Sequence, residues 1–174
     1  MSNADEVRPL TRVIGRPTAT SYRITPVGEA DLEDLLPLMQ AYCEFYGASP
    51  SDEALLAMSR ALIEDPLRDG VQLLARLENG HAAGFATIFW SWSTLSAARV
   101  GVMNDLYVRP DARGAGLADA LIDACLQTGR GRGDIARVGW QTARNNTRAQ
   151  RVYERIGAVR EEWIDYSNAC VDES

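Results

Sequence analysis

The chain has 174 residues, of which 46% are hydrophobic and 24% are charged, and its net charge is −6. This length suits one domain with a substantial core. The acidic balance excludes the basic surface that nucleic-acid phosphates require, so we expect no nucleic-acid partner. No run reaches the roughly 18 apolar residues that cross a bilayer, and the N-terminus lacks a secretory apolar core. We therefore expect a cytoplasmic protein without a membrane partner.

The first part of the chain combines an aperiodic segment with one predicted strand and two predicted helices. Residues 1–20 show no period, so we expect a disordered lead before a single domain over residues 21–174. Alternation predicts a strand over Ser21–Val27. Helical spacing predicts a helix from Leu32 to Tyr46, and Ser51 is placed to cap a second helix that ends near Glu64.

The rest of the chain alternates strands with helices. Strands are predicted over Val71–Glu78, Ala82–Trp92 and about Arg99–Val108, with an Asn79-Gly80 turn between the first two. A helix over Gly116–Thr128, a strand over Ala136–Thr142, a helix over Thr147–Ile156 and a strand near Glu162–Ser167 follow. The order β-α-α-β-β-β-α-β-α-β predicts an α/β (α+β) fold, in which helices cover the faces of a mixed sheet.

The side chains that commonly bind metals or form disulfides are sparse. Cys43, Cys125 and Cys170 are far apart without a CxxC spacing, and His81 is the only histidine. We expect neither a disulfide framework nor a metal site, and we place Cys125 in the core. All 18 basic residues are arginine, which excludes a lysine Schiff base and a P-loop lysine.

The segment Arg113–Ala118 has the character of a phosphate-binding loop. Gly114 and Gly116 let backbone amides approach an anion, and the helix that starts there adds unpaired N–H donors. A dinucleotide fingerprint is disfavoured because Asp119 stands where its third glycine would be, and a Walker loop is excluded. At this point a glycine-rich turn without a ligand remains the alternative.

Two motifs now give a specific resemblance. Arg113-Gly114-Ala115-Gly116-Leu117-Ala118 is similar to motif A of the GNAT superfamily of acetyltransferases, Gln/Arg-x-x-Gly-x-Gly/Ala. The segment Asn146–Ala158 resembles the family's motif B, in which an asparagine, an alanine, a tyrosine and a glycine recur at fixed spacing. The resemblance covers about residues 21–168. It implies a GNAT-like, mostly antiparallel sheet with helices on both faces, and acetyl-CoA as co-substrate without a metal.

The resemblance also implies how coenzyme A is held. The strand before the loop would pair with the pantetheine arm, and the loop amides would take the pyrophosphate. The amide of Leu106 would polarise the thioester carbonyl. Asn146 would bind pantetheine, although a helix N-cap explains it equally well. The cofactor-binding residues implied are Leu106, Tyr107, Val108, Arg113, Gly114, Ala115, Gly116, Leu117, Ala118, Asn146, Ala149 and Tyr153.

Two catalytic residues follow from the same resemblance. Spacing alone favours a core tyrosine at Tyr153, whereas the motif makes it the general acid that protonates the departing thiolate. Asp105 is a candidate base or an anchor for the substrate ammonium; alternatively it satisfies nearby backbone amides. Asn104 departs from the glutamate of some relatives, which leaves a side chain or water as the base.

The acceptor is the least determined part of the prediction. Tyr42, Tyr46 and Trp90, together with Asp105, would suit a cationic substrate, although aromatic side chains at these spacings also pack in cores. We favour a small-molecule primary amine over a protein lysine or N-terminus. A non-catalytic acyl-CoA-binding or regulatory module is the alternative from another class. Dimers are common among similar proteins, so a homodimer is compatible with this interpretation.

Overall fold

The computed structural model describes residues 21–168 and Cys170. The chain divides into two compact units, Met1–Gln141 and Thr142–Ser174. The lead expected over residues 1–20 lies outside the described residues, and the single domain expected over residues 21–174 stays a prediction. No helix in the described part of the chain is both long and apolar enough to span a membrane.

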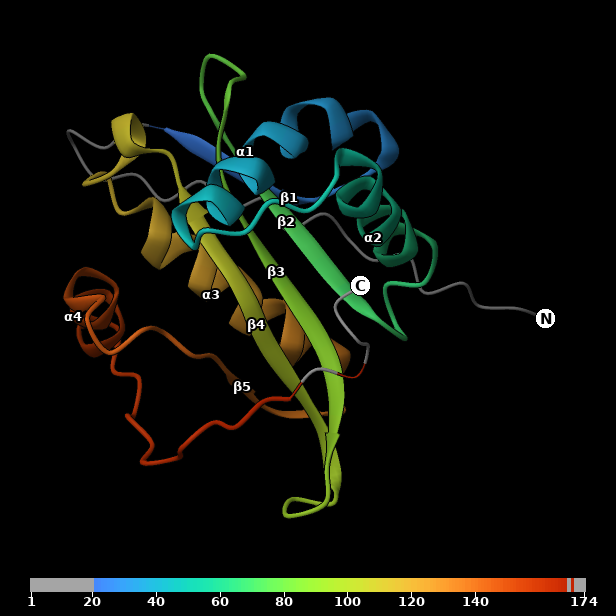
Figure 1. The fold of residues 1–174 in the computed structure, drawn as a ribbon, viewed down its shortest axis with the longest axis vertical. Helices are drawn as coiled ribbons and strands as arrows, with labels where there is room; N and C mark the ends of the chain where they lie inside the picture. Colours follow the sequence, from blue (N-terminus) through green and yellow to red (C-terminus); the bar gives the residue numbers. More distant parts are fainter. Residues whose placement is uncertain (1–20, 169, 171–174) are drawn as a thin grey trace. The chain divides into compact units, whose positions relative to one another are not determined.

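The first unit is built on a five-stranded sheet with the order β1-β2-β3-β4-β5 (Figure 1). Strands β1 to β4 pair antiparallel, and β5 joins β4 in parallel. This mixed and mostly antiparallel sheet confirms the predicted fold class. The strands are β1 (Tyr22–Pro26), β2 (Gly70–Leu77), β3 (Ala82–Ser93), β4 (Ala98–Val108) and β5 (Ile135–Gly139).

Two irregularities in β4 shape the centre of the sheet. Thr87 pairs with Asp105 while Ile88 pairs with Met103, so Asn104 is the extra residue of a β-bulge. The register of β5 on β4 ends at Val102. Among residues 21–168, no strand pairs with the following part of β4 on that edge. The second half of β4 therefore has no strand partner on this edge among these residues.

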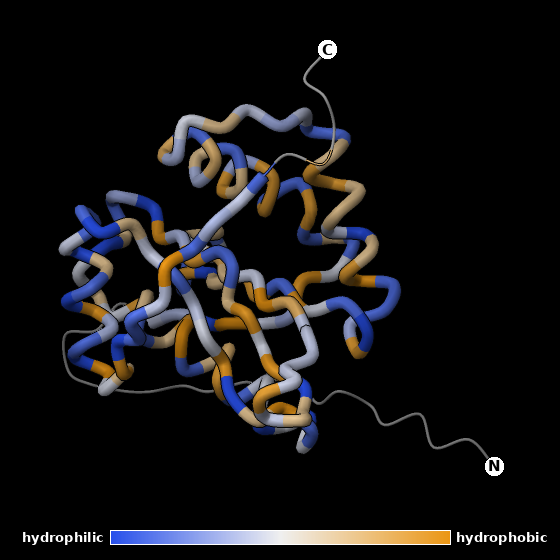
Figure 2. Tube along the Cα trace, turned by 60° about the horizontal axis from the view of Figure 1, so that its bottom comes forward, coloured by the Kyte–Doolittle hydropathy of each residue, from blue (hydrophilic) through white to orange (hydrophobic). Residues whose placement is uncertain are grey.

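Helices cover both faces of the sheet (Figure 1). The helices α1 (Leu32–Phe45) and α2 (Asp52–Glu64) form a hydrophobic core with Leu74 and Phe85. The helix α3 (Leu117–Arg132) lies on the other face, where a Cβ on Gly129 would stand 3.1 Å from Val138 of β5. Helical stretches in Figure 2 alternate between hydrophobic and hydrophilic residues, as expected where one side of a helix faces a sheet.

The predicted helices and five of the six predicted strands are confirmed, with ends that shift by a few residues. Ser51 caps α2 by accepting a hydrogen bond from the amide of Ala54 at 3.2 Å. Cys125 is buried in the core as predicted. The helix of the second unit is α4 (Thr147–Arg155).

The strand predicted near Glu162–Ser167 is wrong. These residues have no regular secondary structure, and Trp163 and Tyr166 are exposed. Alternating side chains favour an extended backbone, but a strand forms only when a neighbour satisfies its N–H and C=O groups. In the described part of the chain no strand pairs with this segment.

Candidate active site

The loop between β4 and α3 has the backbone of an anion cradle. It passes through the short helix η2 (Pro110–Ala112) and then places Gly114 at φ 89° and Gly116 at φ 79°. Positive φ is relaxed only for glycine, and a Cβ at either position would meet no atom within 4 Å. Gly116 is the N-cap of α3 and has no side chain to bind the first N–H groups. Backbone amides at such a helix N-terminus suit an anion.

Two arginines fix this loop to the sheet. Arg113 donates from Nε to the carbonyl of Val108 at 2.8 Å. Arg109 forms a bidentate pair with Asp111 and also donates to the carbonyl of Ala82 at 3.1 Å. The resemblance to the family implies that Arg113 binds the cofactor. Its hydrogen bond shows that it also holds the loop against the end of β4.

The free edge of β4 presents alternate amides. The amide of Arg109 donates to the carbonyl of Ala83 on β3 at 2.9 Å. Because successive N–H groups of a strand point to opposite sides, the amide of Tyr107 also points to β3. The amides of Leu106 and Val108 then point away from β3, towards the edge that β5 leaves unpaired. This is the arrangement that pairing with an extended ligand requires.

Asp105 lies at the centre of a polar group on the α1 face of the sheet. Its side chain is 9% exposed, and Oδ1 accepts a hydrogen bond from Nδ2 of Asn104 at 3.0 Å. The hydroxyl of Tyr42 donates to the carbonyl of Asn104 at 3.2 Å. Burial, followed by the negative charge of Asp105, raises the pKa of Tyr42 well above its usual value. Tyr42 therefore stays a neutral hydroxyl.

The aromatic side chains near Asp105 belong partly to the core and partly to the surface. Tyr42 packs edge-on against Phe85 of the core, with ring centroids 6.0 Å apart, and against Tyr46 at 5.1 Å. Tyr46 is 50% exposed. Tyr42 thus contacts both Tyr46 and Asp105 and packs against the core, whereas a contact of these side chains with the substrate stays a prediction. Burial and then the charge of Asp105 raise the pKa of the neighbouring Cys43 thiol.

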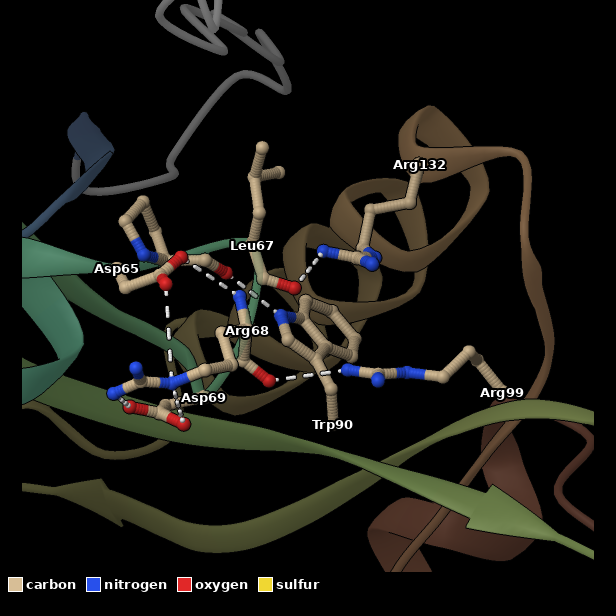
Figure 3. A network of polar contacts seen from close by, with 8 residues as sticks. Asp65, Leu67, Arg68, Asp69, Trp90, Arg99 and Arg132 are labelled. Carbon is tan, nitrogen blue, oxygen red and sulfur yellow. Dashed lines mark hydrogen bonds and ion pairs between the residues drawn. The ribbon is translucent and has the colours of Figure 1, made fainter.

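Trp90 does not belong to this group, contrary to the prediction. Its indole is 8% exposed, donates to the carbonyl of Pro66 at 2.8 Å, and lies under the guanidinium of Arg132 of α3 at 4.8 Å (Figure 3). Side chains alternate along a strand, so Trp90, five residues after Phe85, faces the opposite side of the sheet. It secures the loop after α2 instead of lining an acceptor site.

The motif B residues lie on α4 of the second unit. Asn146 caps this helix, since its Oδ1 accepts a hydrogen bond from the amide of Ala149 at 3.2 Å, which confirms the N-cap interpretation. Gln150 donates to the carbonyls of Ala143 and Arg144 and closes the turn before the helix. Asn146 and Tyr153 are seven residues apart and so share a helix face.

Sequence reasoning missed the bulge at Asn104 and therefore its contact with Asp105. Asparagine and aspartate are both depleted in strands, so their adjacency inside a predicted strand was a usable signal for a bulge. Among residues 21–168 and Cys170, no three His, Cys, Asp or Glu side chains are grouped so that they could hold a metal ion.

Comparisons with known proteins agree with this geometry. A family model described as the acetyltransferase (GNAT) family matches residues 35–158. The uncharacterized N-acetyltransferase YhfO of Bacillus subtilis (strain 168) is 30% identical over 128 residues, which cover 74% of this chain and 83% of that protein. A solved probable acetyltransferase is 34% identical, with a TM-score of 0.71 over 87% of this chain and 99% of its own. The aminoglycoside N-acetyltransferase AAC(6')-Iy, solved in complex with CoA, shares the fold at 21% identity, with a TM-score of 0.76 over 90% of this chain and 100% of its own.

Proposed function

Because this chain belongs to the acetyltransferase (GNAT) family and uses acetyl-CoA as its acyl donor, we propose that its acceptor is the primary amine of a small molecule. The observation that carries this proposal is the nearly buried carboxylate of Asp105 beside the rings of Tyr42 and Tyr46. A carboxylate next to aromatic rings attracts a compact ammonium group. The fold shared with an aminoglycoside N-acetyltransferase is in keeping with a small amine.

The loop and β4 fit the parts of the donor. The first-turn amides of α3, with those of Gly114 and Gly116, are suited to the pyrophosphate, and the open space above both glycines leaves room for it. The amides of Leu106 and Val108 would pair with the pantetheine arm. Acetyl-CoA supplies an activated acetyl thioester. In our proposal the amide of Leu106 donates to the thioester carbonyl oxygen, where negative charge develops during attack.

The chain's own side chains would handle two protons. Asp105 accepts a proton from the substrate ammonium, directly or through water, and leaves a neutral amine as nucleophile. Tyr153 of α4 donates a proton to the sulfur as the carbon–sulfur bond breaks, and the excess proton on the new amide nitrogen leaves through water, which reprotonates the Tyr153 phenolate. Tyr42 does not serve as the base, because burial and the Asp105 charge keep its hydroxyl protonated. Asn146 and Ala149 would line the donor on the same face of α4 as Tyr153.

The experiment that tests the proposal combines binding with turnover. Acetyl-CoA should raise the melting temperature, and free thiol should appear when a panel of small amines is added. Tyr153→Phe should keep the thermal shift and lose most of the turnover. Tyr166→Phe is a matched control, because that tyrosine is 91% exposed and should behave as the wild type.

Three results would count against this proposal. If free thiol is released only with peptide amines, the acceptor is a protein and not a small molecule. Donor binding without turnover on any amine would favour a non-catalytic acyl-CoA-binding module. Unchanged turnover in Tyr153→Phe across the pH range would remove Tyr153 from the mechanism.

A further inference from the structure

Asn104 reaches Asp105 only because the strand is bulged. In a regular strand two consecutive side chains point to opposite faces of the sheet. The bulge inserts Asn104 between the pairs Thr87–Asp105 and Ile88–Met103. With this change in direction, Nδ2 of Asn104 lies 3.0 Å from Oδ1 of Asp105. The extra residue therefore donates a hydrogen bond to the Asp105 carboxylate, which its side chain would not reach in a regular strand.

The main chain of the bulge is held from the other side by α1. A bulged residue is left out of the regular ladder, so its backbone groups need other partners. The carbonyl of Asn104 accepts a hydrogen bond from the hydroxyl of Tyr42, which comes from 62 residues away in the chain. The ring of Tyr42 is itself fixed by Phe85 and Tyr46. Contacts thus run from Tyr42 of α1 to Asp105 along two routes: through Asn104, and directly, since, after burial and charge, a hydrogen bond to Asp105 contributes to the raised pKa of Tyr42.

We propose that Asn104 and Tyr42 are positioning residues, which fix the bulge of β4 so that the Asp105 carboxylate faces the acceptor amine. This inference rests on the proposed function of Asp105. It gives Tyr42 a different role from the substrate contact predicted from the sequence, because its hydroxyl is bonded to the carbonyl of Asn104 and to the carboxylate of Asp105. Asn104 acts here through its neighbour and does not handle a proton.

A double-mutant cycle tests whether Asn104 acts through Asp105. The hydrogen bond from Asn104 has a charged acceptor, so Asn104→Ala should lower kcat/KM for the amine by roughly tenfold or more. The KM for acetyl-CoA should not change. In an Asp105→Asn background, Asn104→Ala should have little further effect, because the carboxylate that it orients is gone. Gln40→Ala is the matched control: it removes a surface hydrogen bond from an amide to Asp52, 2.6 Å long, and should leave turnover unchanged.

A measurement without turnover separates this inference from the proposed function. In the wild type, the Asn104 amide proton that is bonded to Asp105 should have a downfield-shifted NMR signal. This shift should be lost in both Asp105→Asn and Tyr42→Phe. Tyr42→Phe keeps the ring contacts and removes only the hydroxyl. Tyr22→Phe, on β1 at the opposite edge of the sheet, should leave the shift unchanged.

The outcomes are distinct for the two proposals. If the wild type acetylates no amine but the Asn104 amide protons behave as expected, the proposed function fails and the positioning network stands. If Tyr42→Phe leaves the shift of the Asn104 amide proton unchanged, or if Asn104→Ala lowers turnover equally with and without Asp105, the positioning role is wrong. Asn104→Ser replaces Asn104→Ala if the latter does not fold, and the same results are expected because its hydroxyl is too short to reach Asp105.

Discussion

A methyl group at Gly116 should separate the two roles of this glycine, in stability and in donor binding. Gly116 adopts φ 79° and ψ 8° at the N-terminus of α3, and Gly133 adopts φ 76° and ψ −13° at the C-terminus of the same helix. A Cβ at either position meets no atom within 4 Å. Gly116→Ala and Gly133→Ala are therefore a matched pair with the same backbone strain and without a steric clash.

The two substitutions should cost similar stability. A left-handed conformation costs an alanine about 1–2 kcal/mol. Alanine also lowers the conformational entropy of the unfolded chain, which offsets about 0.4–1 kcal/mol of this loss in stability. The net loss is about 1 kcal/mol in each variant, which lowers the melting temperature by roughly 2–4 °C for a chain of this size. Differential scanning calorimetry without ligand measures both values.

Only Gly116→Ala should weaken donor binding. Its methyl group stands where the pyrophosphate would approach the loop amides, and losing one hydrogen bond to a charged phosphate costs about 1.5–3 kcal/mol. The Kd of acetyl-CoA, measured by calorimetric titration, should rise by roughly tenfold or more. In Gly133→Ala the Kd should stay at the wild-type value. Equal Kd values in the two variants would refute the assignment of this loop to the pyrophosphate.

Three further predictions concern parts of the fold away from the loop. Trp90→Phe removes a hydrogen bond to a loop carbonyl, so it should lower the free energy of unfolding in urea by about 1–3 kcal/mol and leave the KM for the amine unchanged; a higher KM for the amine would return Trp90 to the acceptor site. Burial alone would raise the pKa of Asp31, but hydrogen bonds and the charge of Arg76 outweigh it and lower the pKa below 3.8. This stabilisation is complete above about pH 4 and is lost as the pH falls through the folded value, so urea unfolding of Asp31→Asn should vary less with pH below 4 than that of the wild type, and an equal pH dependence would contradict the pairing. Burial raises the pKa of Cys125 to about 12, so a thiol reagent should label the exposed Cys170 in the native protein and Cys125 only after unfolding; native labelling of Cys125 would contradict its packing.

Much of the fold could be read from local sequence patterns. The residues that cap and end helices act within one turn, which is why the starts of α2 at Ser51 and of α4 at Asn146 were predictable. The phosphate loop is also local, since Gly114 and Gly116 impose their own backbone conformations. The same holds for strand alternation, which placed β1 to β5 within a few residues.

What the sequence determined by itself is therefore the order of elements, the loop backbone and the acetyltransferase motifs. The tertiary structure decided which side chains meet. Trp90 turned to the α3 face, Tyr42 reached Asn104 from 62 residues away, and the segment Glu162–Ser167 found no strand to pair with. These outcomes depend on burial and backbone pairing between distant segments, which local patterns indicate only in part. The bulge at Asn104 shows this most clearly, because a residue without a partner in the β3–β4 ladder places its side-chain amide against Asp105.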